Sequence, residues 1–89
     1  MVWRIEYAES VQKDVRKLDA QERKRIRDFI EVKMALLEDP RSLGKSLSGG
    51  LSGLWRYRVG NYRIIANIED RDVRILVVKI AHRKEAYRQ

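Results

Sequence analysis

The chain contains no cysteine and only one histidine, His82, among its 89 residues. The lack of cysteine excludes a disulfide framework, a thiol nucleophile and any metal site that uses thiolates. A single histidine also excludes a metal site built from several imidazoles. We therefore expect no metal and no cofactor, and any chemistry has to come from other side chains.

Long apolar runs are also missing. The N-terminus shows neither the apolar core of a signal peptide nor a stretch that could span a membrane, so we expect a cytoplasmic protein without a membrane partner. A chain of 89 residues that is 44% hydrophobic is expected to form a single domain, residues 1–89, with a modest core. Such a small domain buries only about 60% of its unfolded surface, so a binding partner would add to its stability.

Acidic residues are absent from position 40 to position 68. Residues 1–40 contain nine Lys or Arg and nine Asp or Glu, whereas residues 41–89 contain eleven and four. The formal net charge of +7 therefore lies wholly in the second half. Charge that served only solubility would be spread along the chain, so this concentration indicates a polyanionic partner. The alternative is a basic surface that has no ligand.

The stretch Leu54–Ile68 (LWRYRVGNYRIIANI) has the pattern of a β-hairpin. A two-residue loop at Gly60 and Asn61, with glycine first, predicts a type II′ turn. Because side chains alternate along a strand, the hairpin has one largely apolar face. This face consists of Trp55, Tyr57, Val59, Tyr62, Ile64, Ala66 and Ile68. The opposite face carries Arg56, Arg58 and Arg63.

The predicted turn places Arg58 directly opposite Arg63. Like charges in this position destabilise a sheet by a few tenths of a kcal/mol or more, so stability alone does not explain the pair. An anion bound between the two guanidinium groups does explain it, and a phosphate is the obvious candidate.

The period of the apolar residues predicts the remaining elements. These are a strand over Val2–Tyr7, a helix over Ala8–Leu18, a second helix from Asp19 to about Glu38, a glycine-rich and serine-rich loop over Arg41–Gly53, and a strand over Val73–Ala81. The second helix begins with the spacing of a capping box, Asp19 to Glu22. The order β-α-α-β-β-β predicts an α/β (α+β) fold, with an antiparallel-rich four-stranded sheet and a two-helix hairpin on one face. The face that carries the arginines would then be open.

Arginines on an open sheet face suit the cleavage of RNA by its own 2′-hydroxyl, which needs no metal. Arginine is always charged and binds phosphate with two donors, so it can neutralise the dianionic transition state. Proton transfer requires another group, and the candidates are Tyr87 and His82. The alternatives are that Tyr87 only docks the end of the chain and that His82 is structural. The residues predicted to bind RNA are Arg56, Arg58, Lys45, His82 and Lys84.

Several segments together resemble a known family. They are VQKDVRKLDAQERKRI near the start, EDP at the end of the second helix, LGKSLSGGLSGLWRYRVGNYRII, and IAHRKEAY at the end. The chain resembles the RelE/ParE superfamily of toxins from type II toxin–antitoxin systems, and within it the RelE branch. The resemblance implies a microbial-ribonuclease-like fold. It also implies a metal-independent endoribonuclease that inhibits translation by cutting mRNA in the A site of the 70S ribosome.

The resemblance also assigns roles by position. Arg63 and Arg83 match the family's phosphate-binding and second active-site arginines, and Tyr87 matches its C-terminal tyrosine. Arg56 and Arg58 fall where the best-known member has lysines, and they complete the predicted catalytic set. Arginine can still hold a phosphate there, but it hardly donates a proton.

The family further implies an acidic RelB-like antitoxin, and operator DNA bound only through the antitoxin complex. Two other functions remain open. One is a ParE-like inhibitor of DNA gyrase without nuclease activity, which would need no anion-lined cleft. The other is an RNA-binding module without chemistry, which would need stacking aromatics on the arginine face.

Overall fold

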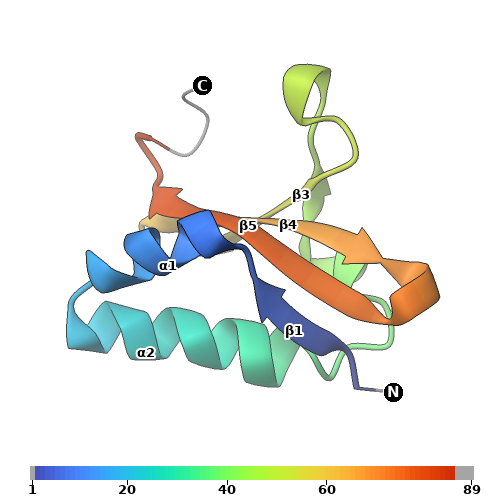
Figure 1. Ribbon diagram of the computed structural model, residues 1–89, viewed down its shortest axis with the longest axis horizontal. Helices are drawn as coiled ribbons and strands as arrows, with labels where there is room; N and C mark the ends of the chain where they lie inside the picture. The colour runs from blue at the N-terminus through green and yellow to red at the C-terminus, as the bar shows by residue number, and fades with distance from the viewer. Residues whose placement is uncertain (1, 86–89) are drawn as a thin grey trace.

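The computed structural model describes residues 2–85, and the chain order of its elements can be followed in Figure 1. The strands are β1 (Arg4–Tyr7), β2 (Lys45–Ser46), β3 (Trp55–Val59), β4 (Tyr62–Glu69) and β5 (Arg74–His82). The helices are α1 (Glu9–Arg16) and α2 (Ala20–Asp28), and α2 continues into a π-helical turn over Phe29–Met34. Short 3₁₀ turns cover Pro40–Leu43, Gly49–Leu51 and Asp70–Asp72.

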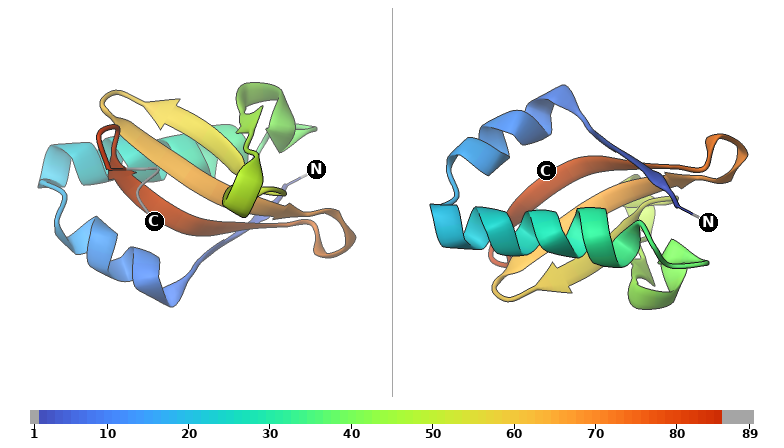
Figure 2. Two further views of the ribbon diagram at one scale, coloured as in Figure 1. Left: turned by 90° about the horizontal axis from the view of Figure 1, so that it is seen from above. Right: turned by 90° about the horizontal axis from the view of Figure 1, so that it is seen from below.

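The strands form one sheet in the order β1-β5-β4-β3-β2. Both helices cover one face of this sheet, and the loop around Gly49–Leu51 rises from the other side (Figures 1 and 2). The core lies between the helices and the sheet, where Val11, Ile26 and Ile30 meet Ile64 and Val77. None of the helices in residues 2–85 is long and apolar enough to cross a membrane.

The β3–β4 hairpin has the predicted register. Arg58 pairs with Arg63, and Tyr57 pairs with Ile64. Gly60 has φ +58°, as the first position of the predicted turn requires, and a side chain is strained at that angle. Tyr57 is 1% exposed and Ile64 is fully buried, so the predicted apolar face is the core face.

The second helix begins as predicted and ends differently. The Asp19 side chain accepts a hydrogen bond from the Glu22 backbone N–H at 2.8 Å. The α-helix does not continue unchanged toward Glu38, because the Ala35 N–H bonds the carbonyl five residues back, at Ile30. Buried residues recur here every fourth position, which is wider than the 3.6-residue α-helical repeat. The wider turn keeps them on one face.

The predicted four-stranded sheet is wrong by one strand. The fifth strand is β2, which lies inside the segment predicted to be a loop and pairs antiparallel with Trp55 and Arg56. Two residues are too few for a hydrophobic period to reveal. The first strand begins at Arg4 and pairs parallel with β5. The last strand begins at Arg74, because Val73 has φ +50° and so cannot be part of a strand.

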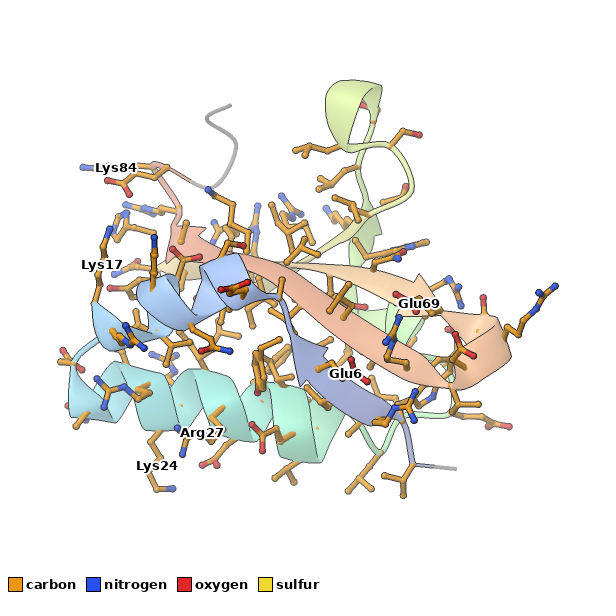
Figure 3. All side chains as sticks on the ribbon, viewed as in Figure 1. Glu6, Lys17, Lys24, Arg27, Glu69 and Lys84 are labelled. Atoms are coloured by element: carbon orange, nitrogen blue, oxygen red, sulfur yellow. The ribbon has the colours of Figure 1, made fainter. Side chains whose placement is uncertain are left out.

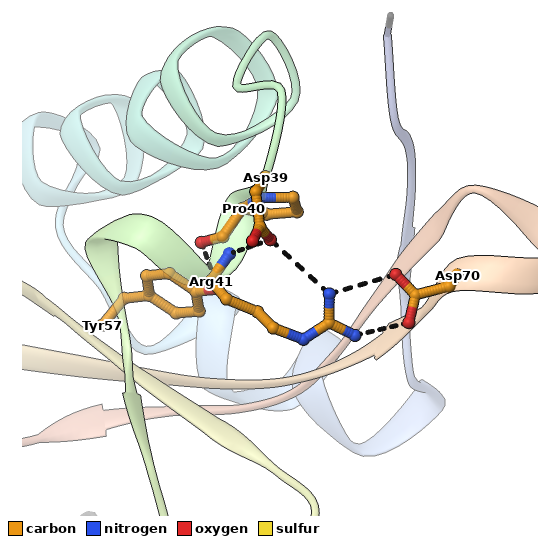
Figure 4. Close-up of polar contacts among 5 residues, drawn as sticks. All are labelled: Asp39, Pro40, Arg41, Tyr57 and Asp70. Atoms are coloured by element: carbon orange, nitrogen blue, oxygen red, sulfur yellow. Dashed lines mark hydrogen bonds and ion pairs between the residues drawn. The ribbon is translucent and has the colours of Figure 1, made fainter.

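Arg41 and Tyr57 anchor the segment that leads into β2 (Figure 4). The Tyr57 hydroxyl donates to the Pro40 carbonyl at 2.8 Å, and burial raises the pKa of this phenol to about 12. The Arg41 guanidinium donates two hydrogen bonds to Asp70 in the β4–β5 turn, at 3.0 and 2.6 Å. It also lies 5.9 Å from the centre of the Trp55 ring. These contacts fix the position of β2 along the sheet.

We expect Tyr57→Phe to lower the free energy of unfolding by about 1–3 kcal/mol, because it leaves the Pro40 carbonyl buried without its donor. Urea denaturation measures the change. Tyr62→Phe is the matched control, since Tyr62 is only partly buried and its hydroxyl donates no hydrogen bond to the described residues. Equal stability of wild type and Tyr57→Phe would contradict the anchoring role.

The Arg41–Asp70 pair gives stability that depends on pH. Hydrogen bonds from Arg41 hold the pKa of Asp70 below its ordinary value of 3.8. The contribution is therefore present above about pH 4 and is lost as the pH falls through the lower pKa of the folded state. We expect Asp70→Asn to be less stable than wild type at pH 7, with a difference that shrinks toward pH 3 in urea titrations. A difference that stays constant with pH would show that the pair is not ionic.

Candidate functional site

Three arginines are grouped around the tip of the β3–β4 hairpin, and we call Arg58, Arg63 and Arg83 the arginine cluster. Arg58 and Arg63 are directly opposite each other, so their side chains leave the same face of the sheet. The backbone N–H of Arg83 donates to the Asn61 carbonyl in the hairpin turn at 2.7 Å. The end of β5 is thereby held against the turn that separates the other two arginines.

Carboxylates neutralise cations elsewhere in the molecule. Ion pairs hold the side chains of Arg4, Lys24, Arg25, Arg41 and Arg74. Glu6 and Glu69, which both bind Arg74, lie at the end of the sheet opposite to Lys84 (Figure 3). Among residues 2–85, no carboxylate comes within 4.0 Å of a guanidinium nitrogen of the arginine cluster. Within this described part of the chain, no ion pair neutralises the positive charge of the cluster.

The sheet face that carries the arginines is less open than predicted. Ile65 pairs with Arg56 and with Lys79, so it belongs to this face, yet it is only 2% exposed. Arg63 is also partly buried, and its Nη1 donates to the Tyr62 carbonyl at 3.1 Å. The cluster is thus bordered by covered apolar surface, in which electrostatic attraction to an anion is stronger than in bulk water.

The structure separates His82 from the other predicted RNA-binding residues. His82 pairs with Tyr62, which places it on the opposite face from Arg63, and its ring lies edge-on to Tyr62 at 5.7 Å. Its Nδ1 accepts from the Lys84 N–H at 3.3 Å. Lys84 itself is exposed in the turn after β5 and points outward (Figure 3). Tyr87 lies outside the described residues.

Lys45, Arg56 and Arg58 do come together, in a hollow at the edge of β3 that the sequence did not reveal. This hollow has a volume of about 240 Å³ and is completed by Phe29, Lys33 and Leu43; we call it the edge hollow. In the sequence, Lys33 interrupts the apolar positions Ile30, Met34 and Leu37 of the second helix, and this interruption is the signal that could have pointed to the hollow.

A larger groove of about 540 Å³ lies between α1 and α2. Its apolar lining includes Val15, Leu18 and Ile26, and its basic lining is Arg16, Arg23 and Arg27. The Tyr7 hydroxyl donates to Glu31 at 2.5 Å beside this groove. Burial and this carboxylate raise the pKa of Tyr7 far above its ordinary value, so the phenol stays protonated.

These arrangements can bind anions but offer few groups for proton transfer. Guanidinium groups can hold a phosphate and the additional charge of a phosphorane. Among residues 2–85, no three His, Cys, Asp or Glu side chains are placed to share a metal ion. The described part of the site therefore has the cationic groups that an anion such as phosphate would need.

Comparison with known proteins gives a family and a fold. The family model described as "ParE toxin of type II toxin-antitoxin system, parDE" matches residues 5–87. The chain is similar to Toxin RelE of Mycobacterium tuberculosis, with 42% identity over 53 residues. This match covers 60% of the chain and only 55% of that relative.

Solved structures of RelE proteins have the same fold. The RelBE2 toxin–antitoxin complex from Mycobacterium tuberculosis matches with a TM-score of 0.85 and 21% identity, over 92% of each chain. The archaeal RelE–RelB complex from Pyrococcus horikoshii matches with a TM-score of 0.73 and 26% identity, over 97% of this chain and 100% of that one. The sheet and helices described above therefore recur in toxins that were solved with their antitoxins.

The opposed arginines should reduce the stability of the free protein. We expect Arg58→Gln to raise the free energy of unfolding by a few tenths of a kcal/mol, because it removes a like-charge pair across the hairpin. The gain should vanish in 1 M salt, where the screening length falls to about 3 Å. Urea midpoints at low and high salt measure both effects. Arg71→Gln, an exposed position in the β4–β5 turn, is the control; a gain of equal size there would mean that net charge alone is responsible.

Proposed function

The chain belongs to the ParE toxin family of type II toxin–antitoxin systems, and from its similarity to Toxin RelE of Mycobacterium tuberculosis we propose that it acts as a RelE-type toxin. Such a toxin would be a metal-independent endoribonuclease that cuts mRNA on the ribosome. The observation that carries this proposal is the direct opposition of Arg58 and Arg63, with the backbone of Arg83 held beside their turn and no ion pair to any of the three from a carboxylate of residues 2–85. An inhibitor that acts only by protein contact does not need such a concentration of unneutralised guanidinium groups.

In the proposed reaction the 2′-oxygen of the message attacks the adjacent phosphate and the 5′-oxygen leaves, which produces a 2′,3′-cyclic phosphate. The negative charge on the phosphate increases in the transition state. Arg58 and Arg63 would bind its oxygens from neighbouring strands, with Arg83 at the third side. Since the hairpin and the end of β5 hold these residues in place before substrate arrives, little reorganisation is required.

Proton transfer is assigned to Tyr87, on the basis of the resemblance to RelE toxins. Guanidinium groups nearby would favour the phenolate and so lower the pKa of this tyrosine. Arg56 and Arg58 can position phosphate, but as arginines they are poor proton donors. His82 is left out of the proposed site, because it lies on the other face of the sheet.

The proposed partner is an acidic antitoxin, as in the RelB–RelE complexes of the relatives. Its carboxylates would neutralise the arginine cluster and so compete with RNA for it. The groove between α1 and α2, with apolar walls and three arginines, suits an amphipathic acidic segment. Operator DNA would be bound through this complex, chiefly by the antitoxin.

The proposal predicts that Arg63→Ala and Arg83→Ala each reduce cleavage of the message by about 10² to 10³-fold, because each removes a donor to the transition state. Ribosomes stalled on a message with a defined A-site codon serve as substrate, and primer extension maps the cut. Circular dichroism checks that the variants are folded.

Arg71→Ala is the control for this experiment, since its side chain is exposed in the β4–β5 turn. Wild-type cleavage by both cluster variants would contradict the proposal. An intact message together with inhibited DNA supercoiling would instead identify a gyrase inhibitor.

A further inference from the structure

The edge hollow exists because β3 loses its outer neighbour after two residues. β2 pairs only Lys45 and Ser46 with β3, because the chain reaches the sheet at Gly44 directly from the 3₁₀ turn over Pro40–Leu43. A Cβ atom at Gly44 would lie 2.9 Å from the Tyr57 ring, so glycine lets the segment cross closely over the strand. Within residues 2–85, β3 has no strand beside it beyond Arg56 on this side. Arg58 can therefore share a hollow with side chains of the helical layer.

The helical layer contributes Phe29 and Lys33 from the π-helical turn. The Lys33 ammonium lies 5.8 Å from the centre of the Phe29 ring, and the ring packs edge-on against Tyr57. Phe29 is thus packed against the core through Tyr57, and its ring contacts the Lys33 ammonium by a cation–π interaction. The π-helical turn matters here, because it keeps Ile30 and Met34 buried while their neighbours Phe29 and Lys33 face the hollow.

In the part of the chain that the structure describes, the lining of the hollow consists of cations and apolar groups. Lys33, Lys45, Arg56 and Arg58 contribute the charge, and none of the described lining residues is acidic. Among residues 2–85, neither Lys33 nor Lys45 forms an ion pair with a carboxylate. Lys33, Lys45 and Arg58 place three positive groups around about 240 Å³, and their mutual repulsion favours an anionic occupant.

We propose that the edge hollow binds a backbone phosphate of single-stranded RNA, with Lys33, Lys45 and Arg58 as its ligands. This inference rests on the proposed function, because Arg58 belongs both to the hollow and to the arginine cluster. RNA bound at the cluster would continue over the edge of β3 and place a neighbouring phosphate beside Lys33. Lys33 is thus an RNA-binding residue on the helix side of the sheet.

Continuity of charge favours RNA over an acidic polypeptide. A nucleic acid carries one phosphate on every nucleotide, so a chain held at Arg58 necessarily presents a further anion nearby. Phe29 and Leu43 form the apolar wall of the hollow. The Lys33 ammonium already lies over the Phe29 ring, so this ring is not open for a nucleobase to stack on it. The hollow therefore binds the backbone without regard to sequence.

The test is the binding of a labelled 12-nucleotide RNA whose 2′-hydroxyls are methylated, so that it cannot be cleaved. Fluorescence anisotropy of the full chain, without ribosomes, gives the dissociation constant from 0.05 to 0.5 M salt. Losing one phosphate contact should reduce the slope of log affinity against log salt by about 0.7. We therefore expect Lys33→Gln to weaken binding about fivefold at 0.1 M salt, and Lys33→Arg to restore it.

Lys24→Gln is the matched control. It removes the same charge from the same helical segment, but Lys24 points away from the sheet and is paired with Asp28 (Figure 3). An unchanged slope in Lys33→Gln, an equal change in Lys24→Gln, or no binding of the RNA by wild type would overturn the inference. So would binding of a polyglutamate peptide that depends on Lys33 while RNA binding does not.

This experiment does not depend on cleavage. If the cluster variants still cut the message, the proposed reaction fails, while a loss of RNA affinity in Lys33→Gln would still establish the hollow as a phosphate site. Conversely, if the protein cuts the message and Lys33→Gln does not change RNA affinity, the phosphate site in the edge hollow is refuted while the proposed reaction stands.

Discussion

The register of the β3–β4 hairpin determines which side chains enter the core and which arginines face each other on the opposite side of the sheet. Gly60 closes the turn, and the two strands then have to place Tyr57 and Ile64 in the core. The same alternation forces Arg58 and Arg63 onto the other face, directly opposite each other. A shift of one residue would bury the arginines and expose the core, so hydrophobic burial holds the repelling pair in position. The burial of the core residues thereby offsets the repulsion between Arg58 and Arg63.

The distribution of carboxylates reinforces this arrangement. At the far end of the sheet, Arg74 is bound by Glu6 and Glu69, and Arg41 is bound by Asp70. These pairs join β1, β4 and β5 and connect the β4–β5 turn to the segment before β2. Near the hairpin tip there are no such carboxylates among the described residues. One end of the sheet thus uses its charges in ion pairs, while the arginines at the other end form no ion pair with the described residues.

The helical layer serves the site as well as the core. Helix α2 and its π-helical turn bury Ile26, Ile30 and Met34, which supports the hairpin from below. The widened turn also directs Lys33 toward the edge of β3, where Arg58 and Lys45 lie. The cationic surface therefore extends around the edge of the sheet instead of ending at its face. A long flexible polyanion can follow such a surface, whereas a single small anion would need only one of its parts.

The sequence by itself determined the features that depend on neighbours along the chain. The hairpin register, the cap at Asp19 and the concentration of charge in the second half follow from local spacing and composition, and residues carrying them also match a known toxin family. Tertiary structure alone decided the parallel pairing of β1 with β5 and the two-residue strand β2. It also brought Lys33 to Arg58, although 25 positions separate them. The physical reason is that contacts between distant segments depend on how the layers pack, and a pattern read along one segment contains no information about its partner.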